Sequence, residues 1–281
     1  MTLLHRVRRF LLYLFLIAVG IVLIYPLVWM FFASFKTNAE IFGSIRLLPQ
    51  NISFDSYVRG WKTGGGVYSI GLFMANSFKL TVPTVLVTIA SSVLVGYGFA
   101  RFDFPGKKLL FSLMISTMML PGTVVMIPRY LTFHKLGWLN SYLPFIVPAA
   151  LGGSVFLIYM MIQFIRGIPR EMDESAKIDG CNSFGILCYL IIPLAKPAIV
   201  SVIIFQTLWT WNDFFNPLIY LNSTRKFPIS LGLRLMLDSS GVNRWDEIMA
   251  MSVVAILPCV ILFALAQKQF IEGVATSGLK G

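Results

Sequence analysis

The chain of 281 residues is 57% hydrophobic and only 12% charged, and its formal net charge is +11. A soluble domain carries about 25% charged residues, so these proportions exclude a soluble globular protein and indicate an integral membrane protein. The basic residues are spread over loops and do not gather on one face, which excludes nucleic acid as a partner and is typical of contact with membrane lipid.

Residues that commonly carry chemistry are sparse. The three cysteines form no C-x-x-C pair, the two histidines are isolated, and no G-x-x-x-x-G-K-[ST] sequence occurs. The sequence also contains no paired carboxylates, metal-ligand cluster or catalytic triad. We therefore predict no catalytic residue, no metal site, no cofactor and no enzymatic activity in this chain.

Six long apolar runs follow one another along the chain. The first comes after a basic flank and is longer than the apolar part of a signal peptide, which has about 7–15 residues, so we expect it to be retained as a span. We predict one all-α domain over residues 1–281, with six transmembrane helices at about residues 10–33, 71–100, 109–127, 142–165, 193–221 and 247–270.

The loops between these runs indicate an orientation. An even number of spans places both termini on one side of the membrane. The short loops at residues 1–9, 101–108 and 166–177 are basic and favour the cytoplasm, whereas most basic residues of the other side lie in longer loops, where the charge rule is weaker. We expect a multi-pass protein with both termini in the cytoplasm.

Residues 171–197 are the longest polar interruption between apolar runs that still has a helical pattern. A first helix is expected at about residues 169–179, and Gly180 is expected to end it because glycine takes the left-handed conformation without strain. Such a polar segment suits docking to a soluble partner better than contact with lipid. One face of this helix has residues at helical spacing, namely Met172, Ser175, Ala176 and Asp179.

A second short helix is expected directly after this glycine. Asn182 or Ser183 can cap its first turn, and the prolines at 193 and 197 mark its junction with the next apolar run. Four residues at helical spacing are expected on one of its faces: Phe184, Leu187, Cys188 and Ile191.

The spacing of Glu174-Ser175-Ala176, Gly180 and Pro193 resembles the EAA loop of ABC importer permeases. The family has alanine where this chain has Ser175, a substitution of similar size. The resemblance implies a type I ABC importer fold in which a coupling helix pair, at about residues 169–191, docks in the cytoplasm against an ATPase. The coupling residues that it implies are Glu174, Ser175, Ala176, Asp179, Gly180, Phe184, Leu187 and Pro193.

Polar and aromatic residues interrupt the fifth apolar run at residues 209–218. They are either hydrogen-bonding groups that join neighbouring helices or the lining of a translocation path, in which aromatic faces suit sugar rings and amides or carboxylates suit hydroxyls. Pro217 removes a backbone hydrogen bond and predicts a kink in this helix. The candidate path residues are Trp209, Trp211, Asn212, Asp213 and Asn216.

The stretch from Trp211 to Leu221 resembles the carbohydrate-permease signature W-N-D-F-x-x-P-L-I-Y-L. Residues 96–101, 128–141, 225–233 and 267–281 resemble further parts of that family, and residues 36–70 resemble it least. The resemblance implies the permease subunit of a binding-protein-dependent sugar importer of the maltose type, in a bacterial or archaeal cytoplasmic (inner) membrane. The implied partners are a second permease subunit, two ATPase subunits that bind ATP and magnesium, an extracytoplasmic solute-binding protein, and a sugar or oligosaccharide.

Two other transport functions remain open at this stage. An ABC permease for a polyol phosphate or another small polar solute has the same coupling segment. An ion-driven secondary transporter needs intramembrane ionisable residues and, as a rule, inverted repeats, for which Asp213 alone is thin support. The spacing between Glu174 and Pro193 favours the ABC interpretation, because an ion-driven carrier has no reason to possess it.

Overall fold

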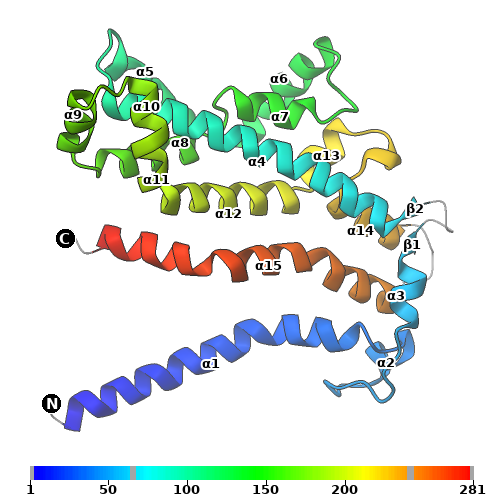
Figure 1. Ribbon diagram of the computed structural model, residues 1–281. Coiled ribbons are helices and arrows are strands. Elements are labelled where there is room, and N and C mark those ends of the chain that lie inside the picture. The colour runs from blue at the N-terminus through cyan, green and yellow to red at the C-terminus, as the bar shows by residue number, and fades with distance from the viewer. Residues whose placement is uncertain (1–2, 64–67, 239–243, 279–281) are drawn as a thin grey trace. The chain divides into compact units, whose positions relative to one another are not determined.

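The computed structural model describes residues 3–63, 68–238 and 244–278 and is almost entirely helical (Figure 1). Residues 279–281, which end the stretch 267–281 compared with the carbohydrate-permease family above, lie outside the described residues. The chain divides into two compact units. Unit 1 comprises Met1–Gly71 and Gly232–Leu257, and unit 2 comprises Leu72–Leu231 and Pro258–Gly281.

Unit 1 combines one long apolar helix with short elements. Its two strands pair antiparallel, with Lys62 opposite Ser69. The unit contains α1 (Leu3–Ala33), α2 (Asn38–Gly43), α3 (Asp55–Gly60), β1 (Lys62–Thr63), β2 (Tyr68–Ser69), most of α14 (Ile229–Asp238) and the first part of α15 (Trp245–Gly278).

An ion cluster joins α3 to the first turn of α15 within unit 1. Arg59 lies 2.7 Å from Asp246 and 3.1 Å from Glu247, and Ser56 donates a 3.2 Å hydrogen bond to Asp246. Burial lowers the pKa of Arg59. The hydrogen bonds to Glu247 and Asp246 and the charges of both carboxylates raise it by more in total, so the pKa of Arg59 lies above its ordinary value. Carboxylates also interact favourably with the positive end of the α15 dipole.

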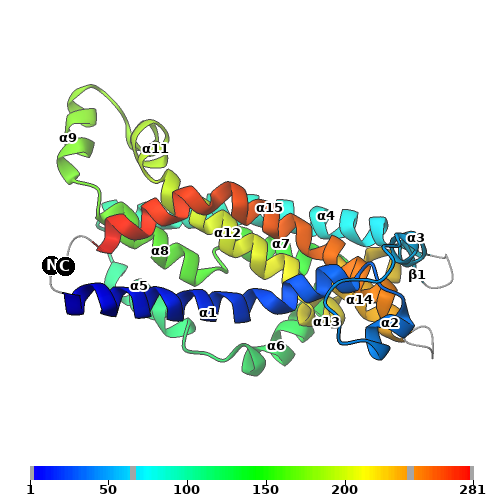
Figure 2. The same cartoon turned by 90° about the horizontal axis from the view of Figure 1, so that it is seen from below.

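Unit 2 holds most of the chain. Figures 1 and 2 show α9 and α11 at one end of this unit and α6 and α13 toward the other. Its elements are the rest of α4 (Ile70–Arg101), α5 (Lys107–Thr117), α6 (Gly122–Lys135), α7 (Leu143–Ala150), α8 (Val155–Arg166), α9 (Arg170–Ile178), α10 (Ser183–Gly185), the π-helix η1 (Ile186–Ile191), α11 (Ile192–Leu194), α12 (Lys196–Asn212), α13 (Phe215–Tyr220), the 3₁₀ turn η2 (Thr224–Lys226), the start of α14 and the end of α15.

The core of unit 2 lies where α4, α8, η1 and α12 meet. Helices α4 and α8 approach closely at Gly96, where an added Cβ would lie only 2.9 Å from Met161 Cβ. Glycine is therefore required at this crossing. The buried core residues are Val93, Tyr97, Ala100, Leu157, Met161, Ile165, Ile168, Ile186, Leu187, Ile191, Ala195, Ala198 and Val202.

Four helical stretches among the described residues are long and apolar enough to cross a membrane. They are Val7–Ala33, Ile70–Arg101, Leu143–Arg166 and Trp245–Gln267, and they correspond to the first, second, fourth and sixth predicted spans. The described residues hold six candidate spans if each of two bent helix pairs also crosses, namely Lys107–Thr117 with Gly122–Lys135 and Ser183–Leu194 with Lys196–Asn212.

The third predicted span, at about residues 109–127, contains a break. Helix α5 ends at Thr117, α6 begins at Gly122, and their axes differ by 102°. Pro121 stands before α6 with ψ 131°, outside the helical range, and proline disfavours helical backbone in the residue before it. A continuous helix cannot pass through this position.

The kink predicted in the fifth span is confirmed. Helix α12 ends at Asn212, Asp213 is extended with ψ 116°, and α13 begins at Phe215. Pro217 lacks the N–H group that would bond the carbonyl of Asp213 four residues earlier. The Ser230 hydroxyl donates a 2.8 Å hydrogen bond to that carbonyl and so satisfies it.

Candidate functional site

One candidate site is the α9–α11 segment (residues 170–194). Helix α9 starts after Pro169, and Asp179 follows its last residue. Gly180 has φ +86°, the left-handed conformation expected of it, and an added Cβ would meet nothing within 4 Å. The side chain of Asn182 then caps α10 by accepting a 2.8 Å hydrogen bond from the Gly185 N–H.

The second half of this segment differs from the α-helix expected there. Residues 186–191 form π-helical turns, in which the hydrogen bond reaches five residues along the chain. Leu187 and Ile191 are buried, whereas the side chain of Phe184 is 69% exposed. The face predicted from α-helical spacing is therefore not formed as one surface.

A buried ion pair fixes α9 to the end of α4. Arg101 Nε lies 2.7 Å from Asp173 Oδ2, and both side chains are largely buried. Neither Arg101 Nε nor Asp173 Oδ1 has a hydrogen-bond partner among the described residues. Arg101 also donates a 2.9 Å hydrogen bond to the Ile168 carbonyl, just before α9. The pair therefore acts chiefly through charge and fixes the start of α9.

Further contacts hold the segment to the core of unit 2. The Tyr97 hydroxyl, on α4, donates a 3.1 Å hydrogen bond to the Ser183 carbonyl at the start of α10. Ala176 is half-buried and packs against the core, which also contains Leu187. Helix α4 therefore contacts both halves of the segment. A displacement of the segment would act on α4 through these contacts.

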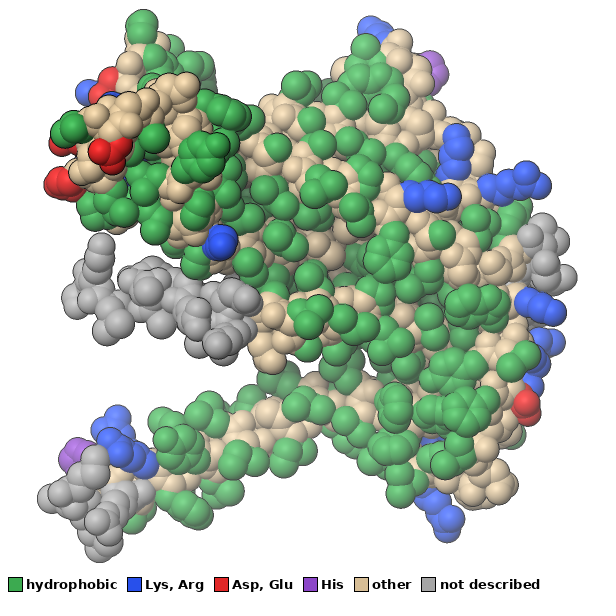
Figure 3. Space-filling model, viewed as in Figure 1, with side chains coloured by type: hydrophobic (Ala, Val, Ile, Leu, Met, Phe, Trp, Pro, Cys, Tyr) green, Lys and Arg blue, Asp and Glu red, His purple; other side chains and the backbone are tan. Residues whose placement is uncertain are grey.

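The outer surface of this segment is both charged and apolar. Acidic side chains gather over α9 on the face shown in Figure 3, where Glu171, Glu174 and Asp179 are exposed. Ile178 is 87% exposed and Tyr189 is 83% exposed. Among the coupling residues implied by the sequence, Ala176 and Leu187 face the core, whereas the exposed ones are Glu174, Ser175, Asp179, Gly180, Phe184 and Pro193.

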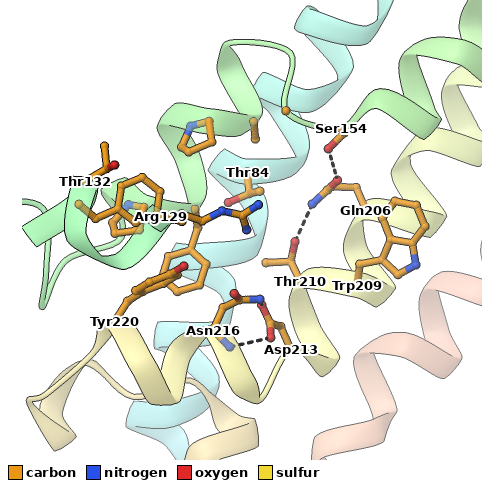
Figure 4. A pocket seen from close by; sticks show the side chains of 16 residues that line it. Thr84, Arg129, Thr132, Ser154, Gln206, Trp209, Thr210, Asp213, Asn216 and Tyr220 are labelled. Atoms are coloured by element: carbon orange, nitrogen blue, oxygen red, sulfur yellow. Dashed lines mark hydrogen bonds between the residues drawn. The ribbon is translucent and has the colours of Figure 1, made fainter. Parts of the chain in front are cut away.

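A second candidate site is a cavity of about 500 Å³ in unit 2 (Figure 4). It lies between α4, α6, α7, α12 and α13, and its volume is in the range of about 300–1,000 Å³ typical of small-molecule sites. The kink at Asp213 opens one wall of it. The polar and aromatic residues that line it include Thr84, Arg129, Ser154, Gln206, Trp209, Thr210, Asp213, Asn216 and Tyr220.

Two hydrogen-bond groups organise the polar wall of the cavity. Gln206 donates a 2.9 Å bond to Thr210 and accepts a 3.2 Å bond from Ser154. Both oxygens of the Asp213 carboxylate are held by Asn216, one by its backbone N–H at 3.1 Å and one by its side-chain amide at 2.8 Å. Thr210 and Asn216 therefore bond to residues of the same predicted span. Hydrogen bonds from residues 209–218 to neighbouring helices are one of the two expectations from the sequence, and the bonds of these two residues described above are not of that kind.

The structure brings together three of the five candidate path residues. Trp209, Asp213 and Asn216 line the cavity, whereas Trp211 and Asn212 lie outside it. Trp211 is buried against the ring of Phe78, with 5.0 Å between the ring centres. Asn212 donates to the carbonyl of Leu208 in its own helix.

Several residues of these sites did not stand out in the sequence. Asp173 was one of several acids in the first turn of a helix, and its partner Arg101 lies 72 positions earlier. Gln206 is an amide inside an apolar run. A polar residue inside a predicted span is a signal that could have identified it. Tyr220 is the tyrosine of the carbohydrate-permease signature and Arg129 lies in another stretch that resembles that family, but neither signal indicates that the two residues line one cavity. Among the described residues, no three His, Cys, Asp or Glu side chains gather as a metal site.

Comparison with known proteins decides the family. The model of the family described as "Binding-protein-dependent transport system inner membrane component" matches residues 92–275. The chain belongs to this family. The permease is 36% identical to the "Arabinooligosaccharides transport system permease protein AraQ" of Bacillus subtilis (strain 168), over 98% of this chain and 97% of that protein.

Solved structures resemble this permease in fold. One is the crystal structure of a bacterial ABC transporter involved in the import of the acidic polysaccharide alginate, with a TM-score of 0.83, 23% identity, and coverage of 96% of this chain and 99% of that one. Another is the crystal structure of a bacterial alginate ABC transporter in complex with an alginate pentasaccharide-bound periplasmic protein, with a TM-score of 0.65, 16% identity, and coverage of 94% of this chain and 95% of that one. The permease therefore has the type I ABC importer fold, and an ion-driven carrier is not favoured.

Proposed function

We propose that this permease forms, with a second permease subunit, the path by which a sugar or oligosaccharide enters the cell. A solute-binding protein delivers the sugar outside the membrane, and two ATPase subunits that bind ATP and magnesium supply the energy. The likeness to a permease named for arabinooligosaccharide transport supports the substrate class. The kinked, polar fifth span and its cavity support the role in the path.

In this proposal the chain spans a cytoplasmic membrane six times, with both termini in the cytoplasm. The bent pair of α5 and α6 then serves as the third span, and α12 with α13 serves as the fifth, while residues 183–194 belong to the coupling segment. A bend inside a span is acceptable where the freed carbonyls find partners, as that of Asp213 does in Ser230. The proposal also keeps residues 1–281 as one transmembrane domain.

The α9–α11 segment is the proposed site of coupling to the ATPase. The observation that carries this proposal is its combination of a fixed base and an exposed apolar surface. Its base is attached to α4 through Arg101 and Tyr97, while Ile178, Phe184 and Tyr189 face outward. Exposed aromatic residues beside charged ones are typical of docking surfaces. Closure of the ATPases would move this segment and, through α4, the spans.

The coupling proposal is tested with Gly180→Arg in the complete transporter. The substitution places a long side chain in a left-handed position on the proposed docking surface, so we expect it to abolish stimulation of ATP hydrolysis by the loaded solute-binding protein. The amount of permease in the membrane should stay unchanged. The same stimulation in the variant and the wild type would contradict the coupling role.

A further inference from the structure

The cavity in unit 2 contains a buried hydrogen-bond donor without an acceptor. Tyr220 is 2% exposed, and its hydroxyl hydrogen has no acceptor among the described residues. Its ring is held edge-on by Phe133 and Phe145, with centre distances of 5.3 and 5.7 Å. A buried hydroxyl without a partner costs about 1–3 kcal/mol, so the rigid position of this one requires a reason.

A cation lies beside this hydroxyl. Arg129 projects from α6 into the cavity (Figure 4), and its charge acts on the Tyr220 hydroxyl. Arg129 forms no ion pair with a carboxylate of the described residues. An arginine near the end of a span can direct its charge toward the headgroups at little cost, yet this one is turned into the cavity.

The other polar groups of the cavity have partners already. Gln206 is bonded on both sides, by Ser154 and to Thr210. Among the described residues that line the cavity, Asp213 is the one acid, and Asn216 donates to both of its carboxylate oxygens. Arg129 therefore supplies a cation without a carboxylate and Tyr220 supplies a hydroxyl without an acceptor, and together they match an anionic acceptor.

The cavity also offers an apolar surface of suitable shape. The side chain of Trp209 is 47% exposed and lines the cavity. Its ring packs between Phe156 and Phe205, each with centres 5.8 Å away, so its orientation is fixed. A fixed aromatic face beside a few polar groups is the usual composition of a small-ligand site.

We infer that this cavity receives an acidic oligosaccharide, in which the carboxylate of one sugar unit is bound by Arg129 and Tyr220 while a neighbouring unit lies against Trp209. The inference rests on the proposed function, because it assumes that a sugar passes through this permease, and it adds the charge of that sugar. Arginine binds carboxylate and phosphate alike, so a sugar phosphate presents the same chemistry from a different source.

The test is uptake by cells that contain the complete transporter. The probes are oligouronates of galacturonate, mannuronate and guluronate, their neutral methyl esters, and a sugar phosphate of similar size. We expect the wild type to prefer an oligouronate to its ester. Arg129→Gln should lower the ratio of acid to ester uptake at least about tenfold, because a charge-assisted bond is lost. Arg129→Lys should lower it less, and Tyr220→Phe should lower it without changing the charge.

Arg225→Gln is the matched control, since Arg225 is exposed and lies outside the cavity. It should leave the ratio unchanged. Equal uptake of acids and esters by the wild type, or an equal loss of both in Arg129→Gln, overturns the inference and leaves the proposed function standing. Preference for the sugar phosphate overturns the carboxylate assignment. If no sugar enters at all, the proposed function fails as well.

A direct measurement separates binding from delivery by the solute-binding protein. Saturation-transfer NMR on the assembled transporter in nanodiscs reports contact between the oligouronate probes and the permeases. Signals from the uronate ring should appear with the wild type and fall severalfold with Arg129→Gln. The same signals in both proteins would overturn the role of Arg129.

Discussion

The α9–α11 segment and the cavity lie toward opposite ends of unit 2 and use their polar residues differently. In the segment, the buried carboxylate of Asp173 faces Arg101, and apolar and charged side chains are exposed on the surface proposed for docking. In the cavity, the charge of Arg129 has no carboxylate and the hydroxyl of Tyr220 has no acceptor among the residues that the structure describes. The region proposed to couple to the ATPase thus pairs its buried charges internally, whereas the region proposed to receive a ligand keeps some unpaired.

The strongest way to break this comparison is to remove one member of the buried pair. Arg101→Ala leaves Asp173 charged and buried, which is expected to cost about 3–5 kcal/mol of stability. The measurement is thermal unfolding of the purified transporter together with uptake. The double variant Arg101→Met with Asp173→Leu should recover most of the stability. If Arg101→Ala lowered the stability no more than the removal of an exposed ion pair does, the pair of Arg101 and Asp173 would not fix α9.

The turn at Gly180 has a smaller expected effect. Gly180→Ala places a side chain at φ +86°, which costs about 1–2 kcal/mol, although the space around it is open. Gly98→Ala is a matched control, because its Cβ would also meet nothing within 4 Å and its φ is not positive. We expect Gly180→Ala to lower the melting temperature and the coupling of ATP hydrolysis to uptake, and Gly98→Ala to change neither. Equal behaviour of the two variants would contradict a requirement for the left-handed turn.

The kink that opens the cavity has a testable local cause. Ser230→Ala removes the donor to the Asp213 carbonyl and should cost about 1 kcal/mol. Pro217→Ala supplies an N–H group that can bond the same carbonyl, so Ser230→Ala should cost less in that background. The free energies of unfolding of the four proteins give the coupling energy. If the free-energy changes of Ser230→Ala and Pro217→Ala are additive, the bond from Ser230 does not depend on Pro217, and Pro217 is not the cause of the free carbonyl at the kink.

The smallest effect is expected at the exposed pair of Asp103 and Lys107, 3.0 Å apart. The hydrogen bond and charge of Lys107 lower the pKa of Asp103. The pair therefore stabilises the fold above the ordinary carboxyl pKa, and this contribution is lost as the pH falls through the lowered pKa. Because Asp103 is exposed, Asp103→Asn should leave the melting temperature unchanged at neutral pH. A clear loss would mean that α5 is fixed by this pair.

Local sequence rules predicted the features that depend on neighbouring residues. The helix before Gly180, the left-handed turn, the cap by Asn182 and the kink caused by Pro217 all follow from propensities within a few positions. Four of the six predicted spans also match candidate spans, although the fourth is divided between α7 and α8. Hydrophobic length is a strong signal because no polar backbone group can stay unpaired in lipid.

Features that depend on distant residues could not be predicted in this way. The pair of Arg101 and Asp173 and the approach of Arg129 to Tyr220 join residues far apart in the chain. The π-helical turns at residues 186–191 shift the buried face away from its α-helical position, and the packing of Leu187 and Ile191 into the core accompanies this shift. Residue spacing alone assumes a regular helix and cannot anticipate either case.

The most direct test of the account is crosslinking from the α9–α11 segment in the complete transporter. Cys181, Cys188 and Cys259 are first replaced by serine, and single cysteines are then placed at Phe184 or Tyr189, which are exposed, and at Leu187, which is buried. The account predicts crosslinks from the two exposed positions to the nucleotide-hydrolysing subunit, with yields that change when ATP binds, and none from Leu187. Absence of crosslinks from both exposed positions, with uptake intact, would contradict it.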